Sequence, residues 1–108
     1  MSCVNISTEF LKIKNNIEHN NFNGEYDKSI DILENIILLN EFKNTDDKFE
    51  AYFLLQSSYY NTFIKDNMLK GIEKIHEIME LDKDIHYYYN IKFNIARGSI
   101  YMAMGMLH

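Results

Sequence analysis

The chain has 108 residues, of which 46% are hydrophobic and 25% are charged, with four glycines and no proline. This length predicts a single domain, and the absence of proline favours long uninterrupted helices over a turn-rich β-sandwich. The net charge is −5, and Arg97 is the one arginine among eleven basic residues. Without a basic cluster for phosphate groups, direct binding to nucleic acid is not expected.

We expect neither a membrane-spanning segment nor a secretion signal in this sequence. No apolar run approaches the roughly 20 residues needed to cross a bilayer. The first eleven residues lack the basic flank and continuous apolar stretch of a signal peptide. Cys3 has no second cysteine for an internal disulfide. We therefore expect a cytoplasmic protein that binds no membrane and no cofactor.

Hydrophobic periodicity predicts two helices in the first part of the chain, over residues 7–21 and 25–40. Phe10 and Ile17 belong to an apolar stripe at helical spacing in the first of them. A cluster of residues that disfavour helix then ends at Gly24, a candidate cap for the end of the first helix. The chain is expected to turn there.

Three more helices are predicted after a polar stretch. One begins near residue 46, where the side chain of Thr45, Asp46 or Asp47 can cap it, and runs to about Thr62. The next spans residues 68–81. The last spans residues 85–107, as one long helix or as two with a bend near Gly98, and is apolar around much of its circumference. The pattern predicts an all-α fold of about five helices.

The chain also contains an internal repeat, with a period of roughly 42 residues. Pairs at this spacing keep their chemical type in most cases, as in Phe10 and Tyr52, Ile30 and Ile72, Leu33 and Ile75, and Tyr59 and Tyr101. Such a repeat is typical of architectures in which one helix pair stacks on the next. The units are residues 7–41 and 46–82, followed by a half unit at 85–107.

The segment from Gly24 through Tyr26 and Ser29 to Ile30 resembles the second half of a tetratricopeptide repeat, with a loop glycine, an aromatic residue, a small residue and an apolar series. The segment that follows Gly71 is similar to the same half, and residues 98–105 resemble a first helix. Unlike the family, the chain has a longer period and lacks the usual proline. The resemblance implies an antiparallel helix-pair stack of two and a half repeats that forms a short right-handed α-solenoid.

Such a stack binds a peptide or a partner protein on the concave face that its first helices line. The resemblance assigns nine residues to partner binding here: Lys12, Asn15, His19, Phe53, Ser57, Tyr60, Asn61, Lys92 and Ser99. Glu18, Ile95 and Met102 occupy further outward positions. The pattern of the subfamily that captures a terminal carboxylate is matched only at Asn15 and Lys92, so that activity is not expected.

The last helix has no second helix to pair with in this sequence. Its apolar end is made of six residues: Ile100, Tyr101, Met102, Met104, Met106 and Leu107. An exposed apolar patch of this kind favours association. We expect a homodimer through this helix, because two-fold dimers are the commonest assemblies, or docking of the helix onto another chain.

Catalysis is not expected, because the short loops offer no nucleophile held against a base and the glycines are isolated. His76 and Glu80 have the spacing of two ligands on one helix, but the second histidine of the zinc-protease motif is missing. The expected function is a non-catalytic adaptor that binds another protein. The alternative is a small acidic regulatory or inhibitory protein, for example of viral or mobile-element origin, that occludes a functional site of its partner. A third interpretation is an enzyme subunit or a metal protein that uses His76 and Glu80.

Overall fold

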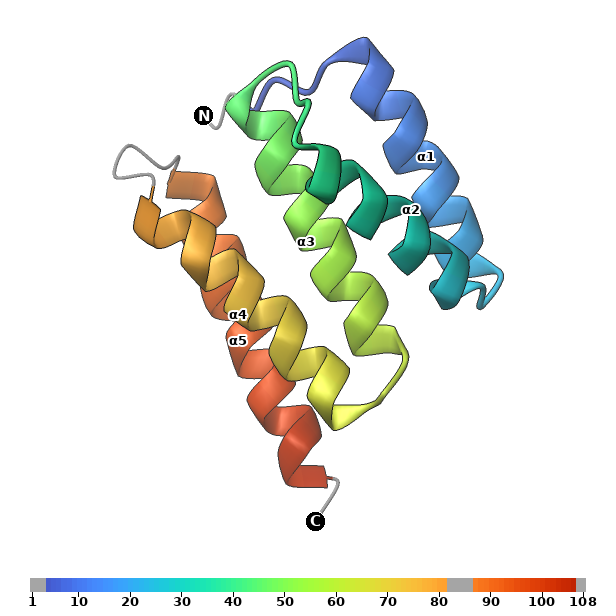
Figure 1. Cartoon of the computed structure of the whole chain (residues 1–108). Coiled ribbons are helices and arrows are strands. Elements are labelled where there is room, and N and C mark those ends of the chain that lie inside the picture. The colour runs from blue at the N-terminus through green and yellow to red at the C-terminus, as the bar shows by residue number, and fades with distance from the viewer. Residues whose placement is uncertain (1–3, 82–86, 107–108) are drawn as a thin grey trace.

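The computed structural model describes residues 4–81 and 87–106. Figure 1 shows five helices in these residues: α1 (Thr8–Phe22), α2 (Tyr26–Leu39), α3 (Thr45–Asn61), α4 (Lys65–Leu81) and α5 (Tyr87–Met106). The described residues contain no strand, so the prediction of an all-α fold is confirmed. None of these helices combines the length and the apolar character needed to span a membrane.

Local side chains determine where the first helices begin and end. Ser7 caps α1, because its side-chain oxygen accepts a hydrogen bond from the Phe10 backbone at 3.2 Å. Asn44 caps α3 in the same way at 2.8 Å, so the prediction that residue 45, 46 or 47 supplies the cap is wrong. The turn before α2 uses Gly24, whose φ of +76° is a conformation that glycine adopts without strain.

The five helices run in alternating directions and pack in chain order. Each helix packs against the next one, and α1 also packs against α3. In Figure 1, α2 and α4 face the viewer, while α3 and α5 lie behind them. The helix predicted to end the chain is continuous through Gly98, without a break, over the residues that the structure describes.

Two apolar clusters form the core, and α3 contributes to both. The first joins α1, α2 and α3 through Phe10, Ile17, Ile30, Leu33, Ala51, Leu55 and Tyr59. The second joins α3, α4 and α5 through Phe49, Phe53, Met68, Ile72, Ile75, Ile78, Tyr89, Phe93, Ile100 and Ala103. Because α3 is covered on several sides, its buried residues point in several directions and give no single apolar stripe.

A glycine allows α4 to lie close to α3. A Cβ atom at Gly71 would lie 3.0 Å from the Gln56 Cα and 3.2 Å from a ring carbon of Tyr59. The corresponding small residue of the first unit, Ser29, is fully buried in the first cluster. The two repeat units therefore have a small buried residue at the same place, and at Gly71 it allows close contact between α3 and α4.

The start of α3 also holds the segment before α1 and the start of α5. Asp47 is buried and accepts hydrogen bonds from the Ser7 backbone at 2.9 Å and the Ser7 hydroxyl at 2.6 Å. The Tyr89 hydroxyl donates to an Asp46 carboxylate oxygen at 3.1 Å. Burial, together with the carboxylates of Glu50 and Asp46, raises the pKa of Tyr89 well above its usual value.

Changing Gly71 to Ala should destabilise the fold although alanine is the better helix former. The gain in helix propensity of about 1 kcal/mol is smaller than the cost of pushing apart two packed backbones, about 1–3 kcal/mol. The control is Gly98→Ala, because nothing lies within 4 Å of a Cβ at that position. Urea unfolding in dilute protein should show a loss of stability for the first variant and a gain for the second. A gain for both would contradict this account of the contact between α3 and α4.

The raised pKa of Tyr89 predicts that the fold loses stability in alkali. In the unfolded chain a tyrosine ionises near pH 10, while Tyr89 in the folded chain stays neutral at that pH. The unfolded state therefore releases a proton first, and the free energy of unfolding falls as pH rises above about 10. Tyr89→Phe should reduce this fall when unfolding is measured between about pH 9 and pH 11. An unchanged slope would contradict the prediction.

Candidate functional site

Three helices that are not all neighbours in the sequence border one groove. The groove has a volume of about 360 Å³, within the range of binding sites for small ligands or side chains. Its lining comes from α1, α3 and α5 alone: Lys14, Glu18, Phe53, Leu54, Gln56, Ser57, Tyr60, Lys92, Ile95, Ala96 and Ser99. We refer to it as the α1-α3-α5 groove.

The groove combines apolar surface with polar groups that can orient a ligand. Phe53 is nearly completely buried, and Leu54 and Ala96 are partly buried. The packing of these three side chains against their neighbours holds the apolar surface of the groove in place. Ser57 and Ser99 contribute hydroxyl groups, and Tyr60 and Gln56 add further polar atoms. A ligand with apolar side chains and polar backbone groups fits this lining.

A buried carboxylate holds two lysines of the groove in place. Glu50 has 3% of its side chain exposed, and its two oxygens lie 3.3 Å from the Lys14 Nζ and 3.0 Å from the Lys92 Nζ. A carboxylate in this position would be costly without opposite charge beside it. The two ion pairs therefore hold α1 and α5 against α3. We refer to Lys14, Glu50 and Lys92 as the ion triad.

Lys92 has further partners that keep its ammonium group near the groove. Its Nζ lies 5.1 Å from the ring centre of Phe53 and 5.3 Å from that of Tyr88. These are cation–π distances, and the aromatic faces add to the attraction of the carboxylate. The Lys92 side chain is still 36% exposed, so its ammonium group remains accessible from the groove.

Five of the nine residues predicted to bind a partner line this groove: Phe53, Ser57, Tyr60, Lys92 and Ser99. Of the further outward positions, Glu18 and Ile95 also line it. Asn61 is next to it in sequence and donates to the Ser57 carbonyl oxygen at 2.8 Å. The residues predicted on the third and fifth helices therefore line the groove, apart from Asn61 and Met102.

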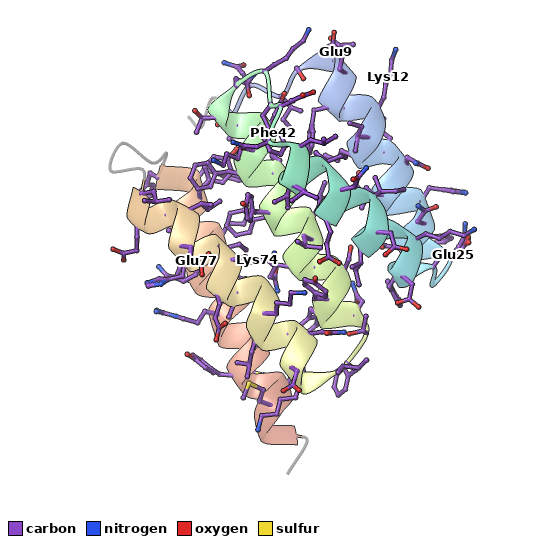
Figure 2. All side chains as sticks on the ribbon, viewed as in Figure 1. Glu9, Lys12, Glu25, Phe42, Lys74 and Glu77 are labelled. Carbon is purple, nitrogen blue, oxygen red and sulfur yellow. The ribbon has the colours of Figure 1, made fainter. Side chains whose placement is uncertain are left out.

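The three residues predicted on the first helix do not line the groove. Lys12, Asn15 and His19 are exposed on α1, and Figure 2 shows Lys12 pointing away from the rest of the chain. The ring of His19 makes a hydrogen bond of 3.1 Å with the side chain of Asn23. The face of α1 that turns toward α3 presents Lys14 and Glu18 instead.

Two charged residues at apolar positions of the sequence indicate the ion triad, although the repeat pattern does not predict it. Lys14 lies within the apolar stripe of the first helix, and Glu50 lies between apolar residues of the third. A charged residue among buried positions needs an opposite charge. A buried Glu50 and a partly buried Lys14 are therefore candidate partners for each other.

The apolar end of the last helix is covered only in part. Ile100 is fully buried against the core, so the expectation that it is uncovered is wrong, and Met104 is half-buried. Tyr101 and Met102 remain 61% and 73% exposed. The side chain of Met106, and Leu107 as a whole, lie outside the described residues.

A second cleft lies between α4 and α5, with a volume of about 390 Å³. Glu73, His76, Glu77 and Arg97 contribute to it, and all four are exposed. His76 and Glu80 lie 3.4 Å apart on the surface of α4. Among the described residues, no group of three or more potential ligands could hold a metal ion.

Comparison with protein-family models, with curated proteins and with solved structures gives no match to this chain. The resemblance to tetratricopeptide repeats therefore rests on the internal repeat and on the residues that carry it.

Removing the charge of Glu50 should weaken the fold through the ion triad. In Glu50→Gln the two lysines lose their shared carboxylate, but both can turn toward water because they are partly exposed. The free energy of unfolding should fall by about 1–2 kcal/mol, less than the cost for a fully buried pair. The control is Glu73→Gln, which replaces an exposed carboxylate on α4. It should change the free energy of unfolding by less than about 0.5 kcal/mol. Equal effects in a urea titration would mean that the triad contributes nothing.

Proposed function

We propose that the chain is a non-catalytic protein-interaction module, in which helix pairs of tetratricopeptide type stack into two and a half repeats. In this arrangement α1, α3 and α5 are the first helices of the successive units. We further propose that the module acts as a cytoplasmic adaptor and holds a segment of a partner protein in the α1-α3-α5 groove. The observation that carries the proposal is that these three helices, which stand at corresponding places in the internal repeat, border one groove.

The ion triad supports this role because it holds the groove before a ligand arrives. Glu50 connects α3 to both outer helices, at 3.3 Å to Lys14 and 3.0 Å to Lys92. A surface held in advance loses less conformational entropy on binding than one that must be ordered. The groove is thus suited to a flexible segment that becomes ordered when it binds.

The lining indicates the kind of segment that fits. Phe53, Leu54 and Ala96 can cover one or two apolar side chains, while the hydroxyl groups of Ser57 and Ser99 can pair with backbone amides or carbonyls. The accessible lysines stand beside an acidic residue of the groove, Glu18, so the lining has no strong excess of either charge. The preferred ligand is therefore an uncharged or weakly charged peptide with apolar side chains.

The same lining supports binding in preference to catalysis. The two serines of the groove have no histidine among the lining residues to act as a base. The buried carboxylate of Glu50 is already engaged by Lys14 and Lys92. The two serines therefore lack a base that would activate them, and Glu50 has a structural role.

Selection from a library of random peptides should test the groove directly. Peptides with spaced apolar residues should be enriched on the parent chain. Their affinity should fall at least tenfold for Ser57→Arg, because the long side chain would fill the groove. Asn16→Arg places the same side chain on an exposed position of α1 outside the lining and should leave affinity within about twofold. Equal loss for both variants, measured by fluorescence anisotropy, would contradict the proposal.

A further inference from the structure

The face of α5 that points away from the core carries no charge. Five large side chains on it are between 45% and 75% exposed: Tyr87, Ile91, Ile95, Tyr101 and Met102. At about 100° per residue, Asn94, Gly98 and Gly105 fall on the same side of the helix. We refer to these eight residues as the outer face of α5. It lies opposite the buried residues of the helix, such as Tyr89 and Ile100.

The exposed side of α4 shows what an ordinary solvent-facing helix of this chain looks like. It presents Asp66, Lys70, Glu73, Glu77 and Glu80 to water, as is usual for the polar face of an amphipathic helix. The outer face of α5 has apolar side chains in the corresponding place. Large apolar side chains exposed together on one helix face are typical of a protein–protein contact.

The internal repeat relates residues of the outer face of α5 to buried residues of α3. Ile91, Ile95 and Tyr101 stand one repeat period after three residues of α3, namely Phe49, Phe53 and Tyr59. On α3 these positions are only 2–4% exposed, because other helices cover them. On α5 they are exposed. The chain thus places core-type residues at positions that its own helices leave uncovered.

We propose that the outer face of α5 pairs with the same face of a second copy of the chain, with the two helices antiparallel and crossing at Gly98. Under two-fold symmetry about Gly98, Ile91 of one copy faces Gly105 of the other, and Ile95 faces Tyr101. Met102 faces Asn94, and the position opposite Tyr87 lies beyond the described residues, so Ile91, Ile95 and Tyr101 make the central apolar contacts. The series Tyr87, Ile91, Asn94, Gly98, Tyr101 and Gly105 also has the alternating spacing of four and three that long helix–helix contacts use.

The charges of the chain do not prevent a second copy from binding at this face. The chain carries a net charge of −5, but α5 contains Lys92 and Arg97 and no acidic residue. Two copies that meet through α5 therefore keep their acidic surfaces apart. Arg97 lies beside the outer face, where its guanidinium donates a hydrogen bond to the Asn94 side-chain oxygen at 3.1 Å, and it lines a cleft with the acidic residues Glu73 and Glu77 of its own chain.

The first helix does not offer an equivalent surface for a head-to-tail contact. Its exposed side includes Lys12, Asn15, Asn16 and His19, which would have to lose their water against an apolar face. The outer face of α5 thus matches itself better than it matches α1. A closed two-fold pair follows, rather than an open filament.

The area available suits a reversible dimer. Four of the large side chains, Ile91, Ile95, Tyr101 and Met102, have a counterpart in this register, and burying them removes roughly 60–120 Å² of apolar surface for each, or about 240–480 Å² per copy. Standard stable interfaces bury about 800 Å² per partner. The dimer should therefore form and dissociate with concentration in the range from about 1 µM to about 1 mM.

Sedimentation equilibrium over that range tests the pairing. The parent chain should approach twice its mass of 12.9 kDa. Ile91→Glu and Met102→Glu should remain monomeric, because each puts a carboxylate into the contact. Leu38→Glu changes a comparably exposed apolar residue on α2 and should dimerise as the parent does. A monomeric parent at about 1 mM, or a monomeric Leu38→Glu, would overturn the proposal.

Disulfide cross-linking tests the crossing point. In a Cys3→Ser background, Gly98→Cys should give a disulfide-linked dimer, because residue 98 meets its own copy. Met102→Cys should not, because the two residues would lie about 12 Å apart along the helices, beyond the roughly 7 Å between Cα atoms that a disulfide spans. Cross-linking at both positions would indicate parallel helices and overturn the antiparallel arrangement. None of the substituted residues lines the α1-α3-α5 groove, so this proposal can fail without the proposed function failing.

Discussion

The burial of one carboxylate connects the first, third and fifth helices. Glu50 is 3% exposed, and a negative charge at that depth is tolerated only with positive charge beside it. Lys14 and Lys92 supply that charge from either side at 3.3 Å and 3.0 Å. The same contacts that neutralise the carboxylate hold α1, α3 and α5 together, and the α1-α3-α5 groove is the surface that these helices then share.

The central position of α3 explains why the two halves of the chain form one unit. Its residues enter both apolar clusters, so neither cluster is complete without it. The close contact at Gly71 brings α4 onto one side of α3, and the buried Ser29 stands at the matching place in α2. The ion triad connects the remaining sides. A change in α3 should therefore affect both halves, since packed interiors transmit small displacements.

The α1-α3-α5 groove and the outer face of α5 differ in their chemistry. The groove contains polar groups and lysines whose positions are held by Glu50, and it suits a short segment whose backbone needs hydrogen-bonding partners. The outer face of α5 has no charge and little that could orient a flexible ligand, so it suits another rigid apolar helix. Ile95 lies on the border of both. Apart from Ile95, a substitution at one of these surfaces does not directly change the other.

Local periodicity was enough to predict the five helices, and the resemblance to tetratricopeptide repeats gave most of the residues that α3 and α5 contribute to the groove. The rotation of each helix about its own axis is decided only by the tertiary structure. That rotation places Lys14 rather than Lys12 beside α3, and it buries Ile100 while Met102 stays exposed. It depends on contacts between residues far apart in the chain, such as Glu50 with both lysines, and the periodicity along one helix does not contain that information.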